Sequence, residues 1–180
     1  MNKQTTTENS ALSFEDFKKL IITKAKVKKA CSDEYKRALL SENWQQLLQV
    51  IKDNARWCYN EGVATTDTML LVPESELIEA NIFVKKENVE QRGGIAHYYS
   101  STSKHYDSST SKHYGSSTSE HYDSSTSKHY GSSTSKHYGS SYSTIYEYGK
   151  YISISDNSIC LERSTGKIYL SNKKIEIVYV

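Results

Sequence analysis

Proline is almost missing from this chain: Pro73 is the only one among 180 residues, which excludes a polyproline linker. The three cysteines, Cys31, Cys58 and Cys160, lie far apart and are odd in number, so they fit neither a disulfide framework nor a zinc-ligand spacing. Reduced thiols in a cytosolic protein are the simplest interpretation. The sequence has no run of about 18 apolar residues to cross a membrane, and residues 1–12 lack the apolar segment of a secretory signal. We therefore expect a cytoplasmic protein without membrane contact, and we predict no cofactor.

A strong net charge is also missing. The chain has 23 Lys and Arg against 21 Asp and Glu, a formal net charge of +2, so binding to nucleic acid is not favoured. The balance hides a division, because residues 1–92 carry many charges of both signs. Residues 93–148 are sparsely charged and rich in Ser, Thr and Tyr. This division predicts two regions of different structure.

The first region has the pattern of a small helical domain. Ser13 precedes Phe14 as a plausible cap of a helix that reaches about Ala30. From Ser41 to Gly62, apolar residues recur at helical spacing: Trp44, Leu47, Leu48, Ile51, Ala55 and Cys58. Short helices follow, one of them opened by Pro73, and residues 81–84 look extended. We predict a disordered start at 1–12, a helical domain at 13–86 and a connector at 87–92.

The second region repeats one eight-residue phrase, such as Ser109-Thr110-Ser111-Lys112-His113-Tyr114-Gly115-Ser116. Tyrosine follows the histidine of every octad. The histidines are His97, His105, His113, His121, His129 and His137. A helix is not favoured because Ser, Thr and Gly are poor helix formers. Disorder is one alternative, since such tracts have few large aliphatic residues to bury. The other is a β-solenoid in which each octad forms one strand and one turn at Gly/Asp-Ser.

Alternation along the octad predicts which side chains face inward. Position four is occupied by Lys112, then Glu120, then Lys128, so it faces water. The period of two then places Thr and Tyr outside with it, and both Ser and His inside. The seventh position alternates between Asp and Gly, which predicts that two octads and their two strands form one coil of the solenoid. An inward histidine row must stay neutral, so we expect the repeat to loosen below about pH 6.

We predict a thin β-solenoid over residues 93–180, with regular octads at 93–140 and degenerate apolar cap strands at 141–180. In the cap strands, Ile145, Leu161 and Ile177 fall at the histidine position, and Ile159 and Ile175 at the third position. The fold class is α+β, a helical domain followed by this solenoid. An apolar solenoid end must be covered, so we expect either the chain itself or a second copy to cover it. We favour a homodimer through the C-terminal strands.

The outward rows supply the candidate binding residues, because rigid tyrosines beside lysines suit a protein partner. They are Tyr106, Tyr114, Tyr122, Tyr130, Tyr138, Lys112 and Lys128. No metal site is predicted, because a linear row supplies one nitrogen per step. Adventitious metal binding would involve His105, His113, His121, His129 and His137. Pairs such as Ser103 and His105 combine a nucleophile with a base, but their repetition argues against a single catalytic cleft.

The phrases Ser-Thr-Ser-Lys-His-Tyr-Gly-Ser and Ser-Thr-Ser-Glu-His-Tyr-Asp-Ser resemble octapeptide-repeat proteins of phages and mobile elements in gut bacteria. Repeats of that family look like Ala/Ser-Thr-Val-Lys/Glu-Ala-Tyr-Gly/Asp-Ser. This chain has Ser103 where the family pattern has valine, and His105 where it has alanine, so its interior is more polar. The phrases Ala30–Tyr35 and Leu47–Asn54 are similar to the helical leader of such proteins. The resemblance implies a solenoid and a mobile-element setting, and it implies no activity.

These observations predict a non-enzymatic protein-binding or assembly module, with an inhibitor of a host defence protein as one concrete form. The alternative is a structural spacer or oligomerisation rod. Tyrosine rows that stack single-stranded nucleic acid, an ice-binding threonine surface and a metal-binding surface are minor alternatives.

Overall fold

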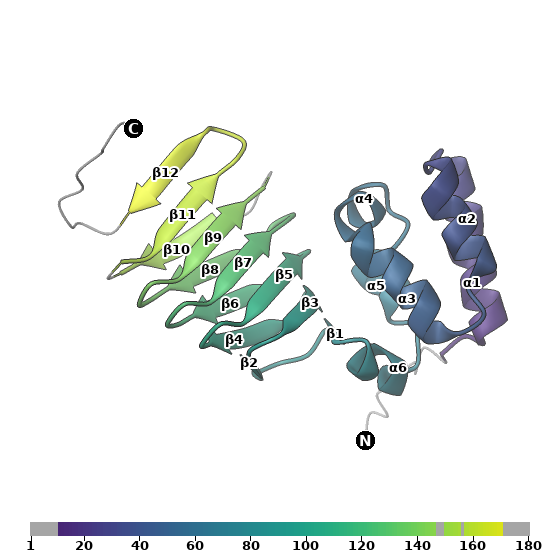
Figure 1. Ribbon diagram of the computed structural model, residues 1–180, viewed down its shortest axis with the longest axis horizontal. Coiled ribbons are helices and arrows are strands. Elements are labelled where there is room, and N and C mark those ends of the chain that lie inside the picture. Colours follow the sequence, from purple (N-terminus) through teal and green to yellow (C-terminus); the bar gives the residue numbers. More distant parts are fainter. Residues whose placement is uncertain (1–10, 147–149, 156, 171–180) are drawn as a thin grey trace, which may run out of the picture. The chain divides into compact units, whose positions relative to one another are not determined.

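The computed structural model describes residues 11–146, 150–155 and 157–170. It has an α+β architecture in which a helical region precedes a parallel β-solenoid (Figure 1), and the predicted fold class is confirmed. The chain divides into two compact units, Met1–Ala80 and Asn81–Val180. Most of the predicted disordered start lies outside the described residues. Within them, the backbone N–H of Leu12 donates to the carbonyl of Leu71 at 2.8 Å.

The first unit is helical, as its apolar pattern predicts. Its helices are α1 (Phe14–Val27), α2 (Ser32–Leu40), α3 (Trp44–Asp53), α4 (Ala55–Asn60), α5 (Thr66–Met69) and α6 (Glu74–Glu79). Ser13 caps α1, because its Oγ accepts the backbone N–H of Asp16 at 3.2 Å. The core contains Phe17 and Leu47, both fully buried. Within the described residues, no helix has both the length and the apolar content that a membrane crossing requires.

The single helix expected from Ser41 to Gly62 is instead two helices, and this prediction was wrong. Asn43 caps α3, whereas Ser41 ends α2. The break between α3 and α4 falls at Asn54, whose side chain donates to the carbonyl of Val50 at 3.0 Å and to Glu34 at 2.7 Å. An asparagine that bonds locally to the backbone competes with helix continuation. The apolar stripe of the sequence continues across this break.

The helical part ends earlier than expected. Residues 81–84 are extended, as predicted, and they form β1 (Ile82–Val84). The segment 87–92 is not a connector, because it contains β2 (Val89–Arg92). Both strands pair in parallel with solenoid strands. The solenoid therefore begins before the first recognisable octad.

Two sheets form the solenoid, and successive strands from β1 to β11 alternate between them (Figure 1). Sheet A has the order β1-β3-β5-β7-β9-β11-β12, and sheet B has the order β10-β8-β6-β4-β2. The strands after β2 are β3 (Ile95–Tyr99), β4 (Thr102–Tyr106), β5 (Thr110–Tyr114), β6 (Thr118–His121), β7 (Thr126–His129), β8 (Thr134–His137), β9 (Tyr142–Ile145), β10 (Lys150–Ile154), β11 (Ile159–Glu162) and β12 (Lys167–Leu170). Thr102 pairs with Thr118 and His113 with His129, so identical positions two octads apart lie side by side. The predicted coil of two octads is confirmed.

The seventh octad position forms the corner of each coil. Asp107 and Asp123 both have φ of 54°, and Gly115 has φ of 66°, a left-handed conformation that glycine and aspartate tolerate best. Gly139 stands where the alternation predicts aspartate. A Cβ at Gly139 would lie 2.9 Å from the backbone nitrogen of Asp123. Glycine is required there because the neighbouring coil approaches too closely for a side chain.

Serine and histidine face inward in the regular octads, as alternation predicts. Ser103, Ser111 and His105 are at most 4% exposed. His97 is an exception. It pairs with Lys112, an outward position, while Tyr98 pairs with His113 inside. The pairing from β3 to β5 falls one position short of two octads, so the octad register shifts and Tyr98 takes the inward place.

The C-terminal end departs from the octad register in the opposite direction. Ile145 pairs with His129 and is buried, as predicted. Leu161, however, pairs with Thr144, and Glu162 takes the histidine position beside Ile145. The third position belongs to Cys160 and not to Ile159, because the pairing from β9 to β11 exceeds two octads by one position. Strand β12 then pairs antiparallel with β11, so the chain itself covers this edge of sheet A. Ile175 and Ile177 lie outside the described residues.

Candidate functional site

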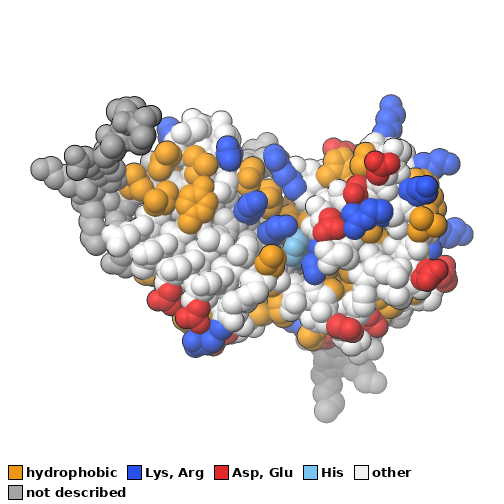
Figure 2. Space-filling view, viewed as in Figure 1, with side chains coloured by type: hydrophobic (Ala, Val, Ile, Leu, Met, Phe, Trp, Pro, Cys, Tyr) orange, Lys and Arg blue, Asp and Glu red, His pale blue; other side chains and the backbone are white. Residues whose placement is uncertain are grey.

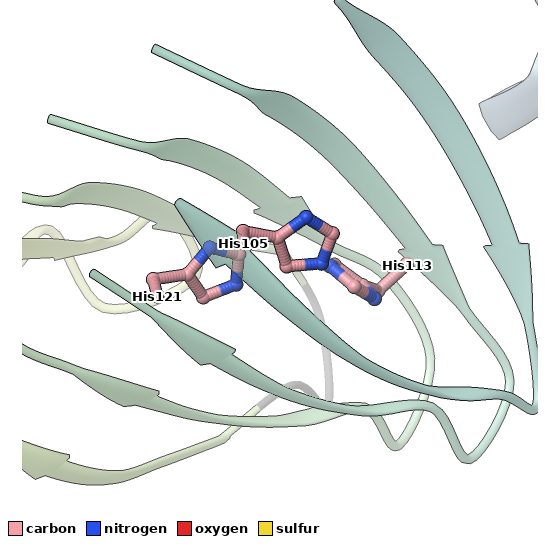
Figure 3. A group of neighbouring side chains, drawn as sticks. All are labelled: His105, His113 and His121. Atoms are coloured by element: carbon pink, nitrogen blue, oxygen red, sulfur yellow. The ribbon is translucent and has the colours of Figure 1, made fainter. Parts of the chain in front are cut away.

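The interior holds five histidines that form what we call the imidazole spine: His105, His113, His121, His129 and His137. Strands β4, β6 and β8 supply one column, and β5 and β7 supply the facing column. Within a column the rings stack with centroids 4.6 to 4.9 Å apart. Across the sheets they meet edge to face at 5.2 to 6.2 Å. Figure 3 shows His105 between His113 and His121. Two interleaved columns therefore bring together more nitrogens than a single row.

Each spine histidine has a serine partner two residues earlier. The Nε2 of His105 lies 2.8 Å from the Oγ of Ser103. The same contact recurs at 2.8 to 3.0 Å in the other four octads. Residues i and i+2 of a strand point to the same face, so the repeated Ser-Lys/Glu-His phrase builds this contact automatically. This serine contact gives the Nε2 of each spine histidine a hydrogen-bond partner.

Within the part of the chain that the structure describes, the second ring nitrogen, Nδ1, has a hydrogen-bond partner only at the two ends of the spine. The Nδ1 of His105 lies 3.0 Å from the Oε1 of Gln91, and that of His137 lies 3.2 Å from the Oγ of Ser141. The Nδ1 atoms of His113, His121 and His129 are buried without a hydrogen-bond partner among the described residues. A buried bare nitrogen costs about 1–3 kcal/mol. The middle of the spine therefore holds unused polar atoms.

Burial fixes the charge state of the spine. It lowers the pKa of His105 to about 3 and that of His137 to about 4. Burial, together with the neighbouring imidazoles, lowers the pKa of His113, His121 and His129 well below the usual value of 6.5. The spine is neutral at physiological pH. The predicted inward, neutral histidine row is thus present, except that it excludes His97.

A polar cluster closes the N-terminal end of the spine. The ring of Tyr98 lies 5.0 Å from those of His105 and His113. Its hydroxyl donates to the Oε1 of Gln91 at 3.1 Å, the same oxygen that contacts His105. Gln91 and Tyr98 also line a cavity of about 230 Å³. Sequence reasoning missed both residues. Gln91 precedes the octads, and only its pairing with His105 across sheet B reveals its place.

The outer face of sheet B, which we call the B face, carries three parallel rows. The threonine row is Thr102, Thr118 and Thr134, the charged row is Glu90, Lys104, Glu120 and Lys136, and the tyrosine row is Tyr106, Tyr122 and Tyr138. In the charged row, Glu120 lies 3.8 Å from Lys104 and 3.3 Å from Lys136. The signs alternate, so the Glu at position 120 removes a repulsion between neighbouring coils.

The tyrosine row of the B face keeps its rings half-buried and ordered. Their centroids lie 4.9 to 5.0 Å apart, with the rings within 11° of parallel. The Arg92 guanidinium lies 4.6 Å from the centroid of the Tyr106 ring. The Tyr122 hydroxyl donates to Glu120 at 2.9 Å, which lowers the pKa of Glu120. Tyr106, Tyr122 and Tyr138 therefore form a prearranged surface.

The other predicted binding tyrosines are not exposed, and this prediction was wrong. Tyr114 is 1% exposed and Tyr130 is 5% exposed. They belong to sheet A, where they stack with centroids 5.1 Å apart and continue to Tyr99 and Tyr146 at 4.8 Å. The buried ring of His97 lies 5.9 Å from that of Tyr114. The octads of the two sheets differ only at positions four and seven, and neither difference predicts which tyrosine row is buried. Lys112 is half-buried and Lys128 exposed on sheet A.

Apolar side chains gather on the outer face of sheet A at the C-terminal end, a surface we call the apolar patch: Tyr142, Ile159, Ile168 and Leu170. Ile159 pairs with both Tyr142 and Leu170, so these three form one row across three strands. Ile168 is the most exposed of the four, at 61%. Figure 2 shows this hydrophobic cluster over β9, β11 and β12. An exposed contiguous apolar patch marks an interaction surface.

The helical unit contains a cavity of about 260 Å³ lined mainly by apolar residues, including Leu47, Ile51 and Trp57. Cys58 also lines it, and burial raises the pKa of that thiol to about 12, which makes it unreactive. The cavity is a place for an apolar group.

The Ser–His pairs of the spine have the contact distance of a nucleophile and its base. Both members of each pair are buried, so a substrate does not reach them. A scan of protein-family models and searches of curated proteins and of solved structures each found nothing similar to this chain.

Proposed function

We propose that this chain is a non-enzymatic binding module that presents the B face to a protein partner. The tyrosine row Tyr106, Tyr122 and Tyr138 carries the proposal. Tyrosine is enriched in protein interfaces because it offers a large apolar surface with a polar end. Ring stacking and the Glu120 contact already hold these side chains in place. Little side-chain entropy remains to be lost on binding.

The rest of the B face supports an extended partner surface. The Oγ1 atoms of Thr118 and Thr134 lie 3.3 Å apart, and the backbone N–H of Asn88 donates to Thr102 at 2.9 Å. The charged row alternates in sign, so it favours a partner with mixed charges over a polyanion. Tyr114 and Tyr130 take no part in this surface. The partner would lie along the solenoid axis and contact several coils.

The setting of the partner comes from the sequence. The octads resemble repeats of phages and mobile elements, which supports a partner in the bacterial host cytoplasm. A defence protein that the chain occupies and inhibits is the concrete form of this proposal.

The test is capture of a partner from bacterial lysate with matched variants. Thr118→Arg places a bulky charge in the centre of the B face, and Ser116→Arg places the same charge at an exposed corner. We expect a protein that wild type and Ser116→Arg capture equally and that Thr118→Arg loses. Equal capture by all three chains would contradict the B face as the binding surface.

The second candidate is an oligomerisation rod, which the apolar patch favours. In this case two copies would meet through the C-terminal end of sheet A, where Ile168 is exposed. Ile168→Glu should then convert a dimer to a monomer in analytical ultracentrifugation, while Ser164→Glu in the neighbouring turn should not. Deletion of residues 124–139, which form one coil, distinguishes the two candidate functions. An oligomerisation rod should still assemble after losing one coil, whereas a B face that matches the length of its partner should lose affinity.

A further inference from the structure

We propose that the N-terminal end of the imidazole spine binds one divalent transition-metal ion through His105, His113 and His121. Zn²⁺ is the reference ion, and Co²⁺ and Ni²⁺ are its probes. The sequence argued against a metal site because one row offers one nitrogen per step. The structure removes that objection, since facing columns interleave. One ring nitrogen from each of the three histidines lies within 4.8 Å of the others (Figure 3).

Two of the three histidines have a ring nitrogen free to bind an ion, whereas both nitrogens of His105 already have hydrogen-bond partners. The Nδ1 atoms of His113 and His121 have no hydrogen-bond partner among the described residues. When Nε2 carries the proton and donates it to Ser111 or Ser119, Nδ1 is left as an unprotonated ligand. A second partner on the opposite nitrogen is the usual support for a metal-binding histidine. The repeated serine contact already supplies it.

The ligand type selects the class of ion. Three neutral imidazoles and one oxygen form a common zinc set, with Zn–N distances of about 2.0–2.1 Å. Ligands at that distance lie roughly 3.4 Å apart around a tetrahedron, so the cluster must contract from its present spacing. Hard ions such as Mg²⁺ and Ca²⁺ prefer carboxylates. All three proposed ligands are imidazoles, so the site does not suit these hard ions.

A cavity borders this end of the spine. It has a volume of about 230 Å³ and is lined by Gln91 and Tyr98, and the Oε1 of Gln91 contacts His105. The Nε2 of Gln91 donates to the carbonyls of Gly93, Gly94 and Thr110, so this amide must give up these bonds before an ion passes from the cavity to His105. At the other end, Ser141 covers His137 and bonds in turn to Ser158. The N-terminal end is therefore the site of entry.

The experiment is calorimetric titration of the full chain with Zn²⁺ in a preparation without a histidine tag. Cys31 is the exposed cysteine among those described, so the titration uses a Cys31→Ser background. His113→Gln removes one ligand, and His97→Gln removes a histidine outside the spine as a matched control. We expect about one ion per chain, with affinity reduced at least tenfold by His113→Gln and unchanged by His97→Gln. Circular dichroism confirms that each variant is folded.

Co²⁺ supplies an independent readout. Visible d–d bands without a thiolate charge-transfer band indicate nitrogen and oxygen ligands. If His113→Gln does not fold, Gln91→Ala replaces it, and we expect faster Co²⁺ uptake because the cover is gone. The proposal is overturned if Zn²⁺ does not bind, if both histidine variants bind equally well, or if Co²⁺ reports thiolate ligands.

Discussion

Acidification should unfold the solenoid and leave the helical unit intact, because every histidine of the chain lies at or beyond position 97. Burial lowers the folded-state pKa of all five spine histidines, whereas in the unfolded chain each titrates near 6.5. The unfolded state therefore binds more protons below pH 6.5. Stability is complete above that pH and falls as the pH decreases toward the folded-state values.

The size of the effect follows from linkage. A histidine that is neutral when folded and titrates at about 6.5 when unfolded lowers the free energy of unfolding by about 0.8 kcal/mol at pH 6 and by about 2 kcal/mol at pH 5. Five such groups cost about 4 kcal/mol at pH 6 and about 10 kcal/mol at pH 5. The sites are neutral in the folded state and independent in the unfolded chain, so the costs add. A domain with about 5–15 kcal/mol of stability does not withstand the larger loss.

The assay is urea unfolding from about pH 7.5 to about pH 5, with excess chelator to remove metal ions. Strand circular dichroism reports the solenoid. Fluorescence of Trp44 and Trp57, the two tryptophans of the chain, reports the helical unit. We expect the strand signal to lose stability steeply while the tryptophan signal changes little. His121→Gln should reduce the slope by about 1.4 kcal/mol per pH unit. A strand transition that does not move between these pH values would refute the inward, neutral spine.

Three substitutions test the packing of the coils, each by urea unfolding. Ser119→Ala leaves both nitrogens of its histidine bare and should cost about 1–3 kcal/mol, whereas Ser116→Ala at an exposed corner should cost less than about 0.5 kcal/mol; equal costs would contradict the serine contact. Gly139→Ala should cost about 1–3 kcal/mol more than Gly166→Ala, because both have left-handed φ but only Gly139 faces the neighbouring backbone; equal losses would argue against the close approach. Glu120→Lys should destabilise by about 1 kcal/mol at low salt through like-charge repulsion, and the loss should shrink in high salt. A loss independent of salt would contradict the charged row.

The sequence predicts the solenoid well where the octads are regular. Alternation placed Ser111 and His113 inside because Lys112 and its counterparts need water, and the Asp/Gly alternation predicted the length of the coil. Both inferences depend on the fixed period of two along a strand. The turn preference of Gly/Asp-Ser, as at Asp107, predicted where the corners of the coils lie.

The errors in the register of the solenoid occur where one residue is gained or lost at a corner. Either Tyr98 or Tyr99 could align with Tyr114, so the sequence admits two registers for this strand. In the structure Tyr98 takes the inward position, and its ring, which is larger than an imidazole, fills the end of the spine, where it stacks on both His113 and Phe83. That choice depends on packing with β1, which local pattern does not reveal. Near the other end, the longer step from β9 to β11 moves Cys160 inside and Leu161 outside. A shift of one residue exchanges the two faces of a strand.

The candidate site was predictable only in part. The octads identify the residues of the spine, but they do not show that His105, His113 and His121 converge across two sheets. They also do not distinguish Tyr122, which stays half-exposed, from Tyr114, which is buried. Those outcomes depend on which sheet a strand joins.

The protonation of the imidazoles tests the central claim most directly. Nuclear magnetic resonance of the histidine ring carbons and nitrogens, in metal-free protein near pH 6, separates neutral from charged rings. We predict that the five spine rings remain neutral in the folded state at this pH. Spine rings that titrate near pH 6.5 in the folded protein would place these histidines in water and contradict the account.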